Sequence, residues 1–214
     1  MIKACIFDLD GVIVDTAHYH FLAWKRLADE LHIPFTEQDN ERLKGVSRLR
    51  SMDILLEIGG ISMDSVQKES LANRKNAWFV EYIGQMKPEE IFPGVKSLIE
   101  RLQHTGIKVA LASSSKNAKT VIKLLHIEKI FEVVVDGNMV THSKPDPEIF
   151  LTAARLLAVE AANCLVFEDA AAGVDAALAA GMKCIGVGNA QQLNRATRIV
   201  PATATFDLAD LQKL

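Results

Sequence analysis

The chain has 214 residues, of which 49% are hydrophobic and 24% are charged, and its formal net charge is −3. That length and composition suit one large globular domain, or a core domain with a smaller one. Lysine and arginine form no basic block, so neither nucleic acid nor an anionic membrane is expected as a partner. No apolar run approaches the roughly 20 residues that span a bilayer.

Cysteine usage and the N-terminus both favour a cytoplasmic protein. The three cysteines, Cys5, Cys164 and Cys184, stand in separate apolar runs without the spacing of metal ligands. We interpret them as buried, reduced thiols. The first residues lack the basic and apolar pattern of a signal peptide, so we expect a cytoplasmic chain.

A short motif stands near the start, where an apolar run over residues 2–7 ends in Asp8 and Asp10, followed by Gly11. The run is long enough for a buried strand. Carboxylates are costly beside a core unless something positive pairs with them. We therefore predict that Asp8 is a nucleophile, that Asp10 carries a proton, and that a divalent cation lets the two carboxylates sit together.

Residues 16–86 keep a helical pattern throughout. The first helix is predicted from positions at three- and four-residue steps, namely Thr16, His20, Trp24, Leu27 and Leu31, with Asp15 or Thr16 as its cap and Pro34 beyond its end. Further helices are expected over residues 39–43, 50–58 and 64–83. We interpret this part of the chain as a helical insertion.

From residue 87 onward, apolar strands alternate with helices. Strands are predicted over residues 107–112, 131–135, 164–167 and 183–187, with a short one near Ile199 or Thr205, and helices over 95–102, 117–125, 146–157 and 173–180. This alternation indicates a parallel sheet covered on both faces. The predicted fold class is therefore α/β, with a Rossmann-like core domain over residues 1–15 and 87–214 and an inserted helical domain over 16–86.

Polar side chains follow the ends of these strands. Asp8 and Asp10 follow the first strand, Ser113 the second, Lys144 a loop after the third, and Glu168 and Asp169 the fourth. Ligands of such sheets bind at the carboxyl ends of the strands, so we expect these groups to form one site. Taken singly, each has an ordinary explanation, because acidic and hydroxyl residues often cap helices and a lone lysine is usually solvated.

The combination of carboxylates, a lysine and a hydroxyl suits phosphoryl transfer. Carboxylates are hard oxygen ligands that favour Mg²⁺, which commonly bridges to phosphate. Lys144 and Ser113 would neutralise and hydrogen-bond the phosphoryl oxygens while Asp8 attacks phosphorus in line, giving an aspartyl phosphate. Asp10 is free to give and take a proton at the leaving or attacking hydroxyl.

In this order and spacing, four segments resemble the motifs of the haloacid dehalogenase (HAD-like) superfamily of phosphotransferases: residues 8–12, Ser113, Lys144 with Pro145, and Glu168 with Asp169. The resemblance covers nearly the whole chain and implies that residues 16–86 form a helical cap. It further implies Mg²⁺ bound by Asp8, Asp10, Glu168 and Asp169, and a cis peptide bond before Pro145. Dehalogenases proper lack the second aspartate, so Asp10 disfavours that activity.

Within the superfamily, the chain resembles the β-phosphoglucomutase family. The matching stretches are residues 16–21 with Trp24, 43–48, 74–76 and 110–117. The resemblance implies interconversion of β-D-glucose 1-phosphate and glucose 6-phosphate through phosphorylated Asp8 and a β-glucose 1,6-bisphosphate intermediate that also serves as activator. It implies substrate contacts from His20, Trp24, Lys44, Gly45, Val46, Ser47, Arg48, Ser51, Lys75, Ser113, Ser114, Ser115, Lys116, Asn117 and Lys144. We expect the chain to be a monomer.

The resemblance also assigns roles within the cap. It implies that Arg48 takes the distal phosphate, helped by Ser115 and Asn117, and that His20 joins the hydrogen-bond network of Asp10 and the cap. Closure of the cap would exclude water, which would otherwise hydrolyse the aspartyl phosphate.

Three questions stay open at this point. Leu49 and Arg50 stand where acidic residues are common in the family, so a mutase for a related hexose or disaccharide phosphate is an alternative. A HAD-type sugar-phosphate phosphatase would share the core motifs and differ in the cap. A non-catalytic sugar-phosphate sensor would need no nucleophile, and the complete set of catalytic residues argues against it.

Overall fold

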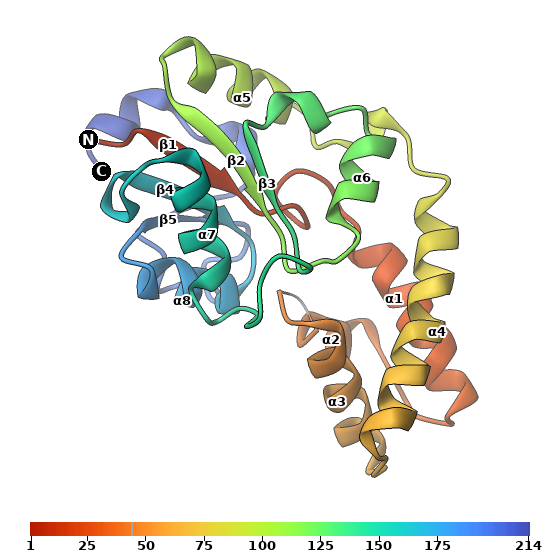
Figure 1. Ribbon diagram of the computed structural model, residues 1–214. Helices are drawn as coiled ribbons and strands as arrows, with labels where there is room; N and C mark the ends of the chain where they lie inside the picture. The colour runs from red at the N-terminus through yellow and green to blue at the C-terminus, as the bar shows by residue number, and fades with distance from the viewer. Residues whose placement is uncertain (44) are drawn as a thin grey trace.

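The computed structural model describes residues 1–43 and 45–214. In these residues one parallel sheet has six strands in the order β3-β2-β1-β4-β5-β6 (Figure 1). The strands are β1 (Ala4–Phe7), β2 (Lys108–Ala112), β3 (Val133–Val135), β4 (Cys164–Glu168), β5 (Lys183–Val187) and β6 (Arg198–Val200). β1 pairs in parallel with both β2 and β4. The predicted α/β class with a parallel sheet is confirmed.

Helices cover both faces of the sheet. Cys5 and Phe7 of β1 belong to a hydrophobic cluster with α5 (Val95–His104) and α6 (Ala118–Leu124). Ala4 and Ile6 belong to a second cluster with α7 (Glu148–Leu157) and α8 (Ala171–Ala179). Successive strand residues point to opposite faces, so a strand that is covered on both sides is apolar at every position.

Short elements are predicted less well from the sequence than long ones. The short strand expected near Ile199 or Thr205 is β6, at Ile199, whereas Thr205 lies in a 3₁₀ turn, η4 (Thr203–Thr205). Further 3₁₀ turns that the patterns do not predict are η1 (Pro88–Glu90), η2 (Glu128–Ile130), η3 (Ala161–Asn163) and η5 (Leu208–Gln212). Turns of this length are too short to carry a periodic apolar pattern.

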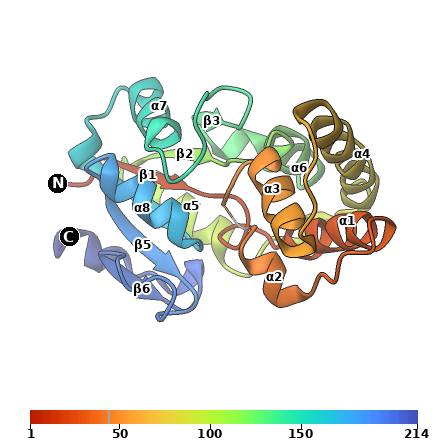
Figure 2. The ribbon, with the colours of Figure 1, turned by 90° about the horizontal axis from the view of Figure 1, so that it is seen from below.

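Between β1 and α5 the chain forms a mainly helical segment that contributes no strand to the sheet. Its helices are α1 (Ala17–Glu30), α2 (Glu37–Glu41), α3 (Arg48–Gly59) and α4 (Ser65–Ile83). They have a hydrophobic cluster of their own, which includes Leu27, Met52 and Leu55, and they lie to one side of the sheet (Figure 2). No described helix is both long and apolar enough to cross a membrane.

Side-chain caps explain where two of these helices begin. α3 starts at Arg48, earlier than the predicted Arg50, because the Ser47 hydroxyl accepts a hydrogen bond from the backbone N–H of Arg50 at 3.2 Å. α4 follows Asp64, whose carboxylate accepts from the backbone N–H of Gln67 at 2.8 Å. The cap at Ser47 matters for the site, because it places Arg48 in the first turn of α3.

Candidate active site

A cavity of about 1140 Å³ lies between the carboxyl edge of the sheet and helices α1 to α4. The predicted site residues that line it are Asp8, Asp10, His20, Trp24, Gly45, Val46, Ser47, Arg48, Ser51, Lys75, Ser113, Ser114, Ser115, Lys116, Asn117 and Asp169. Lys144 and Glu168 are buried next to Asp8. Lys44, the remaining predicted residue, lies outside the described residues.

The floor of the cavity contains a buried lysine between two carboxylates. Lys144 Nζ donates to Asp8 Oδ1 at 2.5 Å and to Glu168 Oε2 at 2.8 Å. Burial alone would lower the pKa of Lys144, but the two carboxylates outweigh it and raise that pKa. Lys144 therefore stays charged and holds Asp8 in one orientation. The peptide bond from Lys144 to Pro145 is cis, as the resemblance implied.

Three carboxylates at this edge of the sheet could hold a cation. Oxygens of Asp8, Glu168 and Asp169 lie within 4.8 Å of one another, and carboxylate oxygens are the donors that Mg²⁺ takes. Two glycines leave room for them: a Cβ on Gly11 would lie 2.0 Å from Asp169 Oδ2, and one on Gly173 would lie 2.0 Å from Glu168 Cδ. The residues present therefore fit a magnesium ion.

Asp10, which the resemblance implied as a further magnesium ligand, stands apart from that group of carboxylates. Its carboxylate accepts a hydrogen bond from the Thr16 hydroxyl, and its backbone N–H donates to Asp8 Oδ2 at 2.9 Å. Thr16 is available because Asp15, and not Thr16, caps the start of α1 with its carboxylate. Burial, and after it the Asp8 carboxylate, raise the pKa of Asp10 to about 8. Asp10 is therefore suited to carry a proton at neutral pH.

The loop after β2 supplies hydroxyls and a side-chain amide to the wall of the cavity. Ser113 is buried, and its hydroxyl accepts from the backbone N–H of Ser115 at 3.2 Å. The Ser114 hydroxyl donates to the Gly45 carbonyl at 3.0 Å, and the Asn117 side-chain amide donates to the Asn76 side-chain oxygen at 2.8 Å. This loop therefore contacts the helical segment directly.

His20 and Lys75 contact each other in the wall of the cavity. Lys75 Nζ lies 2.8 Å from His20 Nδ1 and 4.7 Å from the ring centre of Trp24. The resemblance implied a bond from His20 into the network of Asp10 and the cap, and its observed partner is Lys75 of α4. Burial lowers the pKa of both groups well below their usual values.

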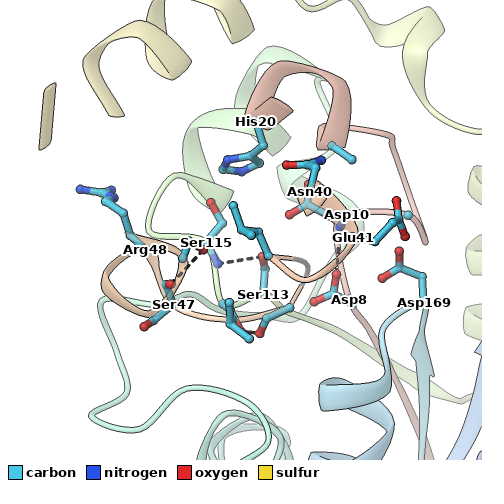
Figure 3. A pocket seen from close by; sticks show the side chains of 18 of the residues that line it. Asp8, Asp10, His20, Asn40, Glu41, Ser47, Arg48, Ser113, Ser115 and Asp169 are labelled. Atoms are coloured by element: carbon cyan, nitrogen blue, oxygen red, sulfur yellow. Dashed lines mark hydrogen bonds between the residues drawn. The ribbon is translucent and has the colours of Figure 1, made fainter. Parts of the chain in front are cut away.

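Arg48 lies at the far end of the cavity from Asp8 and Asp169 (Figure 3). Its guanidinium is half-buried, and burial lowers its pKa. A positive group at the opposite end of the cavity from the candidate nucleophile could bind a second anionic group of the same ligand.

The structure also brings residues into the cavity that the sequence did not reveal. Asn40 and Glu41 come from α2, and Glu69, Asn73 and Asn76 come from α4. The α4 residues follow steps of four and three, so they share one face of the helix. That spacing was visible around Lys75, but polar residues on one face of a helix are usually solvated.

The fold and the motif residues define a family. Residues 2–181 match the family model of the haloacid dehalogenase-like hydrolases, and the chain belongs to this family.

Among its relatives, the chain is 45% identical to a β-phosphoglucomutase from Bacillus subtilis (strain 168), over 96% of this chain and 92% of that protein. It is 35% identical to a phosphorylated carbohydrates phosphatase from Thermotoga maritima, over 94% and 92% of the two chains. A crystal structure of β-phosphoglucomutase from Clostridium difficile has a TM-score of 0.95 and 41% identity, and the match covers 100% of this chain and 96% of that one.

Proposed function

We propose that the chain is a β-phosphoglucomutase that interconverts β-D-glucose 1-phosphate and glucose 6-phosphate. The observation that carries the proposal is a cavity with the candidate nucleophile Asp8 at one end and the Arg48 guanidinium at the other. A mutase must bind a reacting phosphate and a distal one at the same time. The 45% identical β-phosphoglucomutase from Bacillus subtilis supports the same activity.

The first half of the cycle uses Asp8 and its buried partner. When bound by Asp8, Glu168 and Asp169, Mg²⁺ supplies positive charge to the transferring phosphoryl group. Lys144 fixes one oxygen of Asp8, and the backbone N–H of Asp10 fixes the other. In the phosphoenzyme, a sugar hydroxyl attacks phosphorus, the bond to the Asp8 oxygen breaks, and Asp10 takes the proton of the hydroxyl.

The second half reverses these roles on the other end of the sugar. The product of the first half is β-glucose 1,6-bisphosphate, which turns over in the cavity. Asp8 then attacks the other phosphorus, the bond to the sugar oxygen breaks, and Asp10 returns its proton to that oxygen. Asp8 ends phosphorylated again, so the phosphoryl group lost in one half is regained in the other.

We also propose that residues 16–86 act as a cap domain over this site. Two hydrogen bonds support the assignment, because they join the loop after β2 to this segment: Ser114 to Gly45, and Asn117 to Asn76. A closed cap keeps water from the aspartyl phosphate. Arg48, Ser115 and Asn117 then hold the distal phosphate while the reacting phosphate lies at Asp8.

A coupled assay tests the proposal. The protein receives β-glucose 1-phosphate, Mg²⁺ and a trace of glucose 1,6-bisphosphate, and both glucose 6-phosphate and free phosphate are measured. We expect glucose 6-phosphate to dominate, with the Asp8→Asn variant inactive. Free phosphate as the main product would contradict the proposal.

The same assay separates the second candidate, a HAD-type sugar-phosphate phosphatase. The 35% identical phosphorylated carbohydrates phosphatase from Thermotoga maritima favours this alternative. Repeating the assay with other hexose 1-phosphates and with disaccharide phosphates tests the remaining alternative, a mutase for a related substrate.

A further inference from the structure

Arg48 has a neutral partner on α4. Arg48 Nη1 donates to the side-chain oxygen of Asn73 at 3.1 Å, and both residues line the cavity. Arg48 comes from the first turn of α3 and Asn73 from the middle of α4. The contact therefore fixes the direction of the guanidinium from a second helix.

This partner differs in charge from those of the neighbouring arginines. Arg50 Nη1 pairs with Glu57 at 2.8 Å, and Arg74 Nη2 pairs with Glu30 at 2.5 Å. In the described part of the chain, no carboxylate lies within 4.0 Å of the Arg48 guanidinium in an ion pair. Arg48 thus keeps its full charge toward the cavity, while the other two are neutralised on the surface.

The geometry points to Asn73 as a positioning residue for the distal phosphate of the substrate, a role that rests on the proposed mutase function. An amide oxygen accepts one N–H of Arg48 and leaves the remaining donors of the guanidinium for phosphate. A carboxylate at the same place would compete with phosphate for those donors and would cancel the charge that attracts it. The neutrality of Asn73 is therefore as important as its hydrogen bond.

Glu69 is a carboxylate that could compete with Asn73 as the partner of Arg48. It lines the same cavity and lies four residues before Asn73, one turn away on the same face of α4. In a variant without the Asn73 oxygen, we expect Arg48 to pair with Glu69 instead, and that ion pair would withdraw the guanidinium from the ligand.

The test is binding of glucose 6-phosphate to the unphosphorylated protein with Mg²⁺, measured by calorimetry. We expect Asn73→Ala to raise the Kd about five-fold, as the loss of one hydrogen bond predicts. Asn73→Asp should raise it by about ten-fold or more, because a hydrogen bond to a charged group is stronger. Adding Glu69→Gln to Asn73→Ala should recover part of the lost affinity.

Two controls distinguish a specific effect on Arg48 from a general disturbance of the fold. Phosphorylation of Asp8 by acetyl phosphate, which has no distal phosphate, should proceed at the parent rate in every Asn73 variant. In steady state, KM for the sugar phosphate should rise more than kcat falls. A Kd for Asn73→Asp within two-fold of the parent would overturn the inference, and so would equal losses in Asn73→Asp and Asn73→Ala.

The inference and the proposed function fail in different ways. A parent protein that releases phosphate without forming glucose 6-phosphate contradicts the mutase proposal. The Kd of the Asn73 variants is measured by binding alone, without turnover. The binding experiment therefore tests the role of Asn73 separately from the mutase activity.

Discussion

The side chains of His20 and Lys75 share one hydrogen bond between α1 and α4, with Nδ1 2.8 Å from Nζ. The His20 ring also stacks on Phe79, with centroids 3.9 Å apart. Burial, and after it the positive charge of Lys75, lower the pKa of His20. The imidazole is therefore neutral in the folded protein, and that state has a consequence for stability.

Stability should depend on pH through His20. In the unfolded chain His20 takes up a proton below about pH 6.5, whereas the folded protein disfavours that proton. This histidine therefore reduces the free energy of unfolding as pH falls through that range. We expect His20→Gln to cost less stability at pH 5 than at pH 8, measured by urea unfolding of parent and variant. A cost of the same size at the two pH values would contradict this role of His20.

Lys144→Met should destabilise the protein and abolish phosphorylation of Asp8. The change leaves Asp8 and Glu168 buried without their shared positive partner, and removal of one member of a buried ion pair costs about 3 kcal/mol or more. Added Mg²⁺ should restore part of the lost stability. The control is Lys68→Met, whose ammonium lies 2.6 Å from Asp53 in a pair that is partly exposed on both sides and should contribute less than about 1 kcal/mol. Equal losses in the two variants would contradict the assignment.

Gly11→Ala should weaken the response to Mg²⁺. Gly11 has φ +73°, and an added Cβ would lie 2.0 Å from Asp169 Oδ2. Gly60→Ala is the matched control, because Gly60 has φ +63° and nothing within 4 Å of the added Cβ. Both variants should lose about 1 kcal/mol from the left-handed backbone. Only Gly11→Ala should also raise the Mg²⁺ concentration that gives half-maximal activity, and an unchanged value would refute the proposed role of Asp169.

Ser114→Ala should increase hydrolysis at the expense of transfer. The change removes the bond from the Ser114 hydroxyl to the Gly45 carbonyl, so the cap should close less firmly over the aspartyl phosphate. We expect faster decay of phosphorylated Asp8 in the absence of sugar, and more free phosphate per glucose 6-phosphate formed. Ser97→Ala, on the exposed side of α5, should match the parent. A decay rate unaffected by Ser114→Ala would exclude this bond from closure.

The strand ends were predictable from the sequence, because each buried strand is an apolar run that stops at polar residues. Asp8, Ser113 and Asp169 line the cavity as the alternation of strands and helices required. The partners of those residues were less accessible. Thr16 looked like a helix cap, yet its hydroxyl donates to Asp10, because Asp15 already caps α1.

The contacts between helices could not be derived from spacing alone. Asn73 and Asn76 share one face of α4, but such a polar face is usually solvated, and the roles of the two residues depend on which side chains of α3 and the core approach them. The same holds for Lys75, whose burial beside Trp24 and His20 is set by packing of α1 against α4. Long-range packing, and not local periodicity, determines these positions.

The position of β1 in the sheet has a consequence for how the chain is made. Residue Ala4 pairs with Lys108 on one side and with Cys164 on the other. During synthesis, the first strand therefore emerges long before either partner. Helices α1 to α4 are translated next, and all of them are made before β2 and β4. Local contacts form sooner than distant ones, so the helical segment can fold on the ribosome first. The sheet, and with it the alignment of Asp8 with Glu168 and Asp169, must wait until β4 has been translated.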